Sequence, residues 1–320
     1  MPDLKKIIIL IPALNEEKTI ASVIQNAPKY IPPFETVEIL VVDDGSSDQT
    51  AVLAREAGAK VIKHQRNKGV GAAFRTGTAA ALELGADAMV NMDGDGQFNP
   101  EDIPKLLAPI TDGRADFTTC TRFQDKALIP KMPKIKLWGN RMVAKIISFI
   151  IGKKIYDASC GFRAYSREAL LRLNLYGNFT YTHESLIDLA YKGIEVEEIP
   201  LSVRGEREFG KSRIANNVWK YGYRTLKIIL KTLKDYKPFQ FFGALGLVIF
   251  LCGIILELVL IIWWFQTDSF SPYKFLGFIG GYLNALGVLV IFFGLIGDTL
   301  LRIKLNQENV LYYEKKRMIE

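Results

Sequence analysis

The chain has 320 residues, of which 41 are lysine or arginine and 34 are aspartate or glutamate, so its formal net charge is +7. Hydrophobic residues make up 49% of it, but they concentrate in the last quarter, and roughly the first 210 residues resemble a soluble domain in composition. Three cysteines without metal-ligand spacing and only two histidines argue against a disulfide framework and a zinc site. The positive excess lies mostly just before the apolar quarter, which does not favour nucleic acid as a partner.

In chain order, short apolar runs rich in β-branched residues alternate with helical patterns. We expect strands at residues 6–11, 37–42, 59–63, 88–92 and 116–121. Helices are expected near residues 17–26, 48–57, 70–84 and 100–107. This alternation predicts an α/β domain with a mostly parallel sheet, in which ligands bind at the carboxyl ends of the strands.

Two segments follow these elements. Residues 123–136 contain Pro130 and Pro133 among basic residues, a pattern typical of a mobile loop. Residues 137–151 are amphipathic, and their apolar face is expected either to pack on the sheet or to lie against a membrane surface.

A stripe of cations precedes the apolar quarter. At steps of four and three residues it contains Lys220, Arg224, Lys227, Lys231 and Lys234. This spacing places the cations on one side of a helix at 214–237, beside an apolar face. The pattern predicts a helix in the membrane surface whose cations reach anionic headgroups. A solvated face packed on the preceding domain is the alternative, and both can hold at once.

Two apolar runs lie near the end of the sequence. Residues 241–265 contain one charge, Glu257, and residues 275–297 contain none, so membrane-spanning helices are predicted at about 241–265 and 275–301. The linker between them is too short for a domain, so we expect a hairpin, and the lysines and arginines outside it predict cytoplasmic termini. The N-terminus lacks a signal-peptide pattern, which gives no sign of secretion.

The expected organisation is a first domain at 1–213, a juxtamembrane helix at 214–237, and a hairpin with a cytoplasmic tail at 238–320. Ionisable groups within membrane spans usually face protein. We therefore expect Glu257 at a contact between helices or subunits. Asp298 is expected to pair with Arg302 one helical turn on.

The run NMDGDGQ at residues 91–97 is the most informative motif. Two carboxylates and an amide at alternate positions after a buried strand suit a hard divalent cation that keeps open positions for phosphate oxygens. A calcium loop is excluded, because Phe98 and Pro104 stand where its glycine and glutamate are required. A solvated acidic turn stays open if the run is considered alone.

Two further motifs follow strands. The pair Asp43 and Asp44 precedes a glycine and is suited either to a base or ribose or to a simple turn. The sequence NKGVG at residues 67–71 opens a helix and can approach phosphate. It is not a dinucleotide fingerprint, because Phe74 occupies the third glycine position, and the chain has no Walker A sequence.

Together, IPALNEE, VVDDGSSDQT, NKGVGAAFRTG, DGDGQ, the strand end Thr121-Arg122-Phe123, SCGFRAY and REFGKSR resemble the family 2 glycosyltransferases. The closest resemblance is to membrane-bound polyprenyl-phosphate transferases, which include the dolichyl-phosphate mannose and glucose synthases. It covers residues 5 to 213 and implies a Rossmann-like GT-A fold. The two-helix tail is similar to that of bacterial and archaeal polyprenyl-phosphate hexosyltransferases.

The resemblance assigns roles position by position. Nucleotide contacts are implied for Pro12, Leu14, Glu16, Val42 and Asp44. Contacts to the donor ribose, diphosphate and a Mg²⁺ or Mn²⁺ ion are implied for Asp93, Gly94, Asp95 and Gln97, the metal ligands being Asp93, Asp95 and Gln97. The donor and acceptor phosphates would be surrounded by Arg122, Lys136, Asn140, Arg207 and Arg213. Four of these residues would carry the catalysis: Asp95, Arg122, Arg207 and Arg213. Leu14 stands where relatives often have tyrosine, and Arg213 replaces a lysine.

The implied reaction moves a hexose from a nucleotide-diphosphate sugar to a polyprenyl phosphate at the cytoplasmic membrane face, with inversion. A phosphate monoester is already anionic at neutral pH, so the attack needs no general base. His183-Glu184 is therefore expected to be structural. UDP-glucose, UDP-N-acetylglucosamine and GDP-mannose all remain open as donors, as does self-association of the chain. The alternatives are another acceptor, such as a polysaccharide, and a non-catalytic membrane scaffold.

Overall fold

The structure, a computed structural model, describes residues 4–319 except 176–180, 205–225, 228–229 and 232. The chain divides into two compact units. The first contains residues 1–222 together with 309–320, and the second contains residues 223–308.

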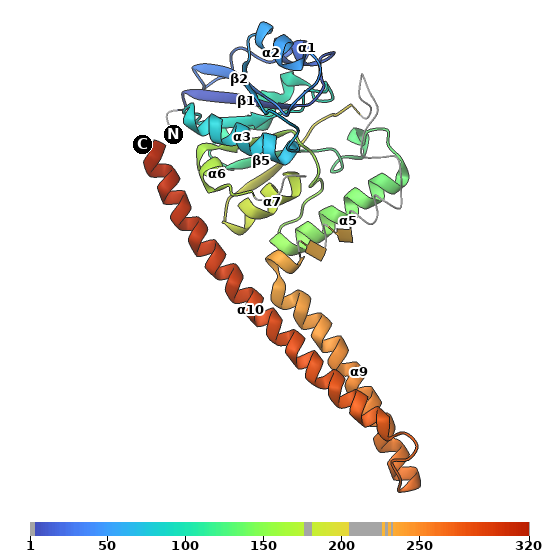
Figure 1. Cartoon of the computed structure of the whole chain (residues 1–320). Coiled ribbons are helices and arrows are strands. Elements are labelled where there is room, and N and C mark those ends of the chain that lie inside the picture. The colour runs from blue at the N-terminus through green and yellow to red at the C-terminus, as the bar shows by residue number, and fades with distance from the viewer. Residues whose placement is uncertain (1–3, 176–180, 205–225, 228–229, 232, 320) are drawn as a thin grey trace. The chain divides into compact units, whose positions relative to one another are not determined.

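The first unit is built on a seven-stranded sheet of order β3-β2-β1-β4-β6-β5-β7 (Figure 1). Its strands are β1 (Lys6–Ala13), β2 (Thr36–Asp43), β3 (Lys60–Lys63), β4 (Ala88–Asn91), β5 (Phe117–Thr121), β6 (Arg163–Ser166) and β7 (Val196–Pro200). All neighbours run parallel except β6, which is antiparallel to both β4 and β5. The predicted mostly parallel α/β sheet is confirmed, and the five predicted strands correspond to β1–β5.

In the described part of the first unit the sheet is accompanied by helices α1–α7, of which α5 packs on α7 (Figure 1). They are α1 (Ile20–Asn26), α2 (Thr50–Glu56), α3 (Val70–Glu83), α4 (Ile103–Thr111), α5 (Lys134–Ile151), α6 (Arg167–Arg172) and α7 (Thr182–Tyr191), and short 3₁₀ helices occupy Pro100–Asp102 and Lys126–Leu128. The prediction of a loop at residues 123–136 was wrong at its end, because α5 already begins at Lys134, directly after Pro133. Proline is well suited to a helix start, since the first N–H groups have no partner within the helix.

The core of the sheet is β1, whose residues Ile7–Ile11 are completely buried. A parallel strand that is covered on both faces consists of a continuous apolar run, and this run allowed the strand to be predicted from the sequence. Helix α3 approaches it closely at Gly77, where a methyl group would lie 2.2 Å from a Leu10 methyl carbon. This contact fixes α3, and with it the 67–71 turn that precedes the helix, against the central strand.

The second unit contains α9 (Pro238–Thr267) and most of α10 (Lys274–Ile319), both long and apolar enough to cross a membrane. Glycines bring the two helices together: a methyl group at Gly246 would lie 2.6 Å from the Gly287 carbonyl oxygen. Close backbone approach at small residues is typical of helix pairs in membranes. Glu257 also packs on α10, since a methyl group at Gly280 would lie 2.7 Å from its Cγ. The expected helix–helix contact of Glu257 is confirmed.

Asp298 and Arg302, both on α10, form the ion pair expected from their spacing, with 3.2 Å between Oδ2 and Nη2. This pair is largely exposed, so it contributes little to stability.

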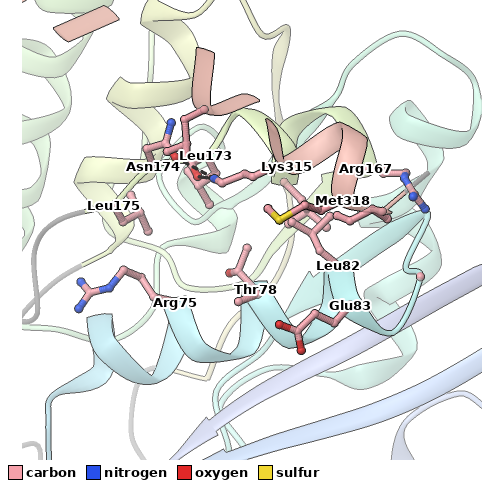
Figure 2. Close-up of a pocket in the computed structure, with 15 residues that line it drawn as sticks. Arg75, Thr78, Leu82, Glu83, Arg167, Leu173, Asn174, Leu175, Lys315 and Met318 are labelled. Atoms are coloured by element: carbon pink, nitrogen blue, oxygen red, sulfur yellow. Dashed lines mark hydrogen bonds between the residues drawn. The ribbon is translucent and has the colours of Figure 1, made fainter. Parts of the chain in front are cut away.

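The end of α10 belongs to the first unit and packs on α6 and the chain after it (Figure 2). Lys315 Nζ donates hydrogen bonds to the Leu173 carbonyl oxygen at 3.0 Å and to Asn174 Oδ1 at 2.8 Å. The Tyr312 hydroxyl donates to Glu168 Oε2 at 2.9 Å. Next to this contact, a cavity of about 830 Å³ lies between α3, α6 and the end of α10. Because Leu173 is the C-cap of α6, Lys315 places its positive charge at the C-terminal end of that helix, where the helix dipole stabilises it.

Candidate active site

The motifs IPALNEE and VVDDGSSDQT, at the carboxyl ends of β1 and β2, are joined by hydrogen bonds. The Asn15 N–H donates to Ser46 Oγ at 2.9 Å, the Ser47 N–H donates to Asn15 Oδ1 at 2.9 Å, and the Glu16 N–H donates to Thr50 Oγ1 at 2.8 Å. Pro12 pairs with Val42 in the parallel register of the two strands. The predicted nucleotide residues of these motifs therefore lie on adjoining strand ends.

Asp44 organises the start of α3. Its Oδ1 accepts hydrogen bonds from His64 Nδ1 at 2.7 Å and the Lys68 N–H at 2.9 Å, and its Oδ2 accepts from the Gly69 N–H at 2.8 Å. The side chain is 3% exposed. The turn interpretation of this aspartate is thus supported by three contacts, and any contact to a base or ribose would be made beside them.

The run DGDGQ follows β4, the strand next to β1. Asp95 is 2% exposed and its Oδ1 accepts from the Gln97 N–H at 3.1 Å. Gln97 and Arg204 exchange two hydrogen bonds, from the Arg204 N–H to the Gln97 carbonyl and from Gln97 Nε2 to the Arg204 carbonyl, each 3.1 Å. This pairing places Arg204, three residues before the REFGKSR motif, against the run.

The donor set of this run fits a divalent cation that shares its ligands with phosphate. In the part of the chain that the structure describes, no three His, Cys, Asp or Glu side chains gather tightly enough to enclose a metal. The run itself supplies two carboxylates and an amide. Beside it lies Gly161, where a methyl group would come within 3.2 and 3.3 Å of the Asp93 carboxylate oxygens. The absence of a side chain at Gly161 keeps the space at Asp93 open.

Arg122, at the end of β5, forms a bidentate ion pair with the buried Asp157. Its Nε lies 2.6 Å from Asp157 Oδ2 and its Nη2 lies 2.9 Å from Oδ1, while Nη2 also donates to Ser159 Oγ at 2.9 Å. Although burial opposes ionisation, the Arg122 guanidinium keeps the pKa of Asp157 below its ordinary value. The pair holds Arg122 in one orientation.

Lys136, on the first turn of α5, lies close enough to Arg122 for the two positive charges to repel each other. Burial, and then the Arg122 guanidinium, lower the pKa of Lys136. Asn140, one turn along α5, is 9% exposed. Lys136 and Asn140 thus lie one turn apart on the same helix, with Lys136 near Arg122.

Asn91 and Tyr181 connect the DGDGQ run with the SCGFRAY motif. Asn91 Nδ2 donates to the Gly161 carbonyl at 2.8 Å and to the Tyr181 hydroxyl at 2.7 Å. The Tyr181 ring stacks on Phe74 of α3 at 4.2 Å between centroids. Sequence reasoning missed Tyr181 and Asp157 as site residues, and it gave no role to Asn91, the first residue of the NMDGDGQ run. Asn91 was marked by that run, and Asp157 stands two residues before the SCGFRAY motif.

The model of the family described as "Glycosyl transferase family 2" matches residues 8–173, more than half of the chain. The chain belongs to this family. Among its relatives is a UDP-N-acetylglucosamine–dolichyl-phosphate N-acetylglucosaminyltransferase from Methanococcus voltae, 32% identical over 72% of this chain and 99% of the relative. Another is a polyprenol monophosphomannose synthase from Mycolicibacterium smegmatis, 30% identical over 67% of this chain and 82% of the relative.

A solved structure shows the same fold. Glucosyl-3-phosphoglycerate synthase from Mycobacterium tuberculosis, in complex with Mn²⁺, uridine diphosphate and glucosyl-3-phosphoglycerate, aligns with a TM-score of 0.56 and 23% identity over 72% of this chain and 79% of that one. The expected GT-A-like fold of this family 2 transferase is therefore confirmed. The long apolar helices, together with relatives that act on dolichyl and polyprenol phosphates, identify it as a membrane protein.

The remaining predicted residues of the family 2 transferase have these positions. Leu14 and Glu16 are half-buried in the loop after β1. Arg207 and Arg213 lie outside the described residues. His183 lies at the start of α7, where burial and then Arg163 lower its pKa to about 4, so the ring is neutral at pH 7.

Proposed function

We propose that this family 2 transferase moves a hexose from a nucleotide-diphosphate sugar to a polyprenyl phosphate at the cytoplasmic face of a membrane, with inversion at the anomeric carbon. The observation that carries the proposal is the loop at residues 157–161. Its first residue, Asp157, holds the Arg122 guanidinium, and its last residue, Gly161, lies against the Asp93 carboxylate. One short loop thus links a cation site and an acidic site, as a reaction between two phosphate-bearing substrates requires.

Asp93, Asp95 and Gln97 would hold the Mg²⁺ or Mn²⁺ ion, with Gly94 between the carboxylates. When bound, the ion supplies positive charge that offsets the charge developing on the departing nucleoside diphosphate. The donor set supports this assignment, and the Mn²⁺ and uridine diphosphate complex of the M. tuberculosis synthase is consistent with it. Pro12, Leu14, Glu16, Val42 and Asp44 would bind the nucleoside, whose base and sugar stay open among the three donors considered above.

Arg122, Lys136 and Asn140 would receive the phosphate of the lipid acceptor. The same helix that carries Lys136 and Asn140 presents a large apolar face outwards, where Trp138 is 61% exposed and Phe149 is 63% exposed. Aromatic side chains of this kind suit the boundary between water and lipid, and lysines beside them suit anionic headgroups. Helix α5 would then place the phosphate site next to the bilayer in which the acceptor lies.

Arg207 and Arg213 would complete the phosphate site, as the resemblance implies. The Gln97–Arg204 pairing supports this, because it places Arg204, three residues before Arg207, beside the run. The attacking phosphate oxygen is already anionic, so these side chains orient and charge-stabilise it without removing a proton. The termini would be cytoplasmic, since lysines and arginines flank the apolar pair on its outer ends.

The test is transfer of labelled sugar into an organic-solvent extract of membranes given polyprenyl phosphate and each candidate donor. Asp95→Asn should lower kcat by about a hundredfold or more with an unchanged melting temperature. Asp112→Asn, an exposed aspartate paired with Arg114, is the matched control and should behave as wild type. Excess EDTA should abolish transfer, and magnesium or manganese should restore it.

Two results would count against the proposal. Full turnover in excess EDTA would remove the metal assignment. Label that enters only water-soluble or polymeric product, with every donor, would remove the lipid acceptor.

A further inference from the structure

Two charged side chains, Glu198 and Arg163, hold the backbone of the loop at residues 156–161 by hydrogen bonds. Glu198, on β7, accepts hydrogen bonds from the Tyr156 N–H and the Asp157 N–H, each 2.8 Å. Arg163, fully buried at the start of β6, donates from Nη2 to the Ala158 carbonyl at 3.0 Å and from Nε to the Cys160 carbonyl at 2.7 Å. The loop is thus fixed through its donors by one residue and through its acceptors by the other.

Glu198 acts at the end of the loop that determines the orientation of Arg122. Both of its carboxylate oxygens are used, one on each N–H group. The Asp157 side chain then binds the Nε and Nη2 atoms of Arg122. Rotation of the Asp157 backbone would therefore rotate the Arg122 guanidinium relative to Lys136.

The position of Glu198 is electrostatically unfavourable for a carboxylate. Burial raises its pKa above the ordinary value despite the two N–H donors, and the Asp157 carboxylate raises it further. Its neighbour on β7, Glu197, has a different environment: it forms an ion pair with Arg114, 2.6 Å from Nη1 to Oε2, on the surface. Successive residues of a strand point to opposite sides of the sheet, so the two glutamates serve different surroundings.

We propose that Glu198 is a positioning residue of the phosphate site: by holding the backbone of Tyr156 and Asp157, it sets the orientation in which Arg122 meets an anionic ligand. It does not touch the substrate itself. The inference rests on the proposed function for the identity of that ligand, the polyprenyl phosphate.

The experiment compares Glu198→Ala with Glu197→Ala in full-length enzyme, with each substrate varied in turn. Glu198→Ala should raise the KM for polyprenyl phosphate about tenfold, the scale for losing a hydrogen bond to a charged group. The KM for the nucleotide sugar should stay within about twofold of wild type. Glu197→Ala, which removes only a surface ion pair, should leave both values unchanged.

Asp157→Asn provides a second variant that keeps the volume of the side chain and weakens its hold on Arg122. It should raise the same KM, and the double variant with Glu198→Ala should be less damaging than the product of the two single effects, because both act on one guanidinium. A Glu198→Ala enzyme with wild-type kinetics would overturn the inference. So would equal increases in both KM values accompanied by a lower melting temperature, since that pattern indicates general loss of structure.

Failure of the positioning role and failure of the proposed function give different results. If wild-type enzyme does not transfer sugar to polyprenyl phosphate, the proposed function is wrong. If wild-type enzyme does so and Glu198→Ala matches it, only the role of Glu198 is wrong.

Discussion

Gly161 gives the sharpest test of the site geometry, because its replacement by alanine adds one methyl group at a known place. The backbone of Gly161 is outside the left-handed region, so alanine is not strained there. The methyl carbon would lie 2.9 Å from the Tyr181 hydroxyl oxygen and 3.2 Å from Asp93 Oδ1, whereas ordinary contacts begin at 3.4 Å. Tyr181 must therefore move by about 0.5 Å and Asp93 by about 0.2 Å.

A misplacement of about 1 Å in a catalytic site can cost about a hundredfold in rate, so a shift of about 0.2 Å at Asp93 should lower kcat by about two- to threefold. We expect this loss in Gly161→Ala, together with a higher concentration of Mn²⁺ for half-maximal activity, at an unchanged melting temperature. Gly243→Ala is the control, since nothing lies within 4 Å of the added methyl group there. Adding Tyr181→Phe to Gly161→Ala removes the oxygen in closest contact and should recover part of the loss. A Gly161→Ala enzyme with wild-type kcat and metal requirement would refute the reasoning.

Three further outcomes are expected. Neutralising the exposed Lys227, Lys231 and Lys234 together should raise the KM for polyprenyl phosphate and spare that for the nucleotide sugar, because each cation near an anionic surface contributes about 1 kcal/mol; equal effects on both would instead indicate packing against the catalytic domain. The pKa of His183 in the folded protein is about 4, below its ordinary 6.5, so the stability of the protein should fall as the pH drops from 6.5 towards 4. His183→Gln should therefore lose less in melting temperature than wild type between pH 7 and pH 5. Parallel curves of melting temperature against pH for the two proteins would contradict this. Glu257→Leu should lower the melting temperature in detergent, since the carboxylate side chain packs on α10, and an unchanged melting temperature and oligomeric state would show that the contact is dispensable.

Of the strands that sequence analysis predicted, β1, β4 and β5 are buried along almost their whole length, whereas the edge strand β3 is only partly buried and was predicted from its apolar residues Val61 and Ile62. The two it missed, β6 and β7, carry charges for specific partners. Arg163 begins β6 and binds loop carbonyls, and β7 contains Glu197 and Glu198 side by side. A strand whose polar side chains are satisfied by distant groups has neither alternation nor continuity in its hydrophobic pattern.

The candidate site shows the same division. The DGDGQ run was recognisable because its ligands are neighbours in sequence. The ion pair of Arg122 with Asp157 joins residues 35 apart, and the bond of Asn91 to Tyr181 joins residues 90 apart. No local pattern marks such pairs, because the antiparallel insertion of β6 between β4 and β5 brings them together. For 137–151 the sequence left packing and membrane contact open; α5 buries Val143, Ala144 and Ile147, so one side of it is packed, and contact of the exposed Trp138 and Phe149 with a membrane stays a prediction.

The packing of Tyr312 and Lys315 against the first unit has a consequence for how the protein is made. The ribosome releases residues 309–319 only after both apolar helices have been synthesised, yet these residues bond to Glu168, Leu173 and Asn174 of the first unit. The first unit is therefore assembled from two separate segments of the chain, residues 1–222 and 309–320, and its last contacts form after α9 and most of α10 have been synthesised. A fragment that stops before the pair, the usual choice for a soluble preparation, would lack these contacts and leave the surface of α6 uncovered.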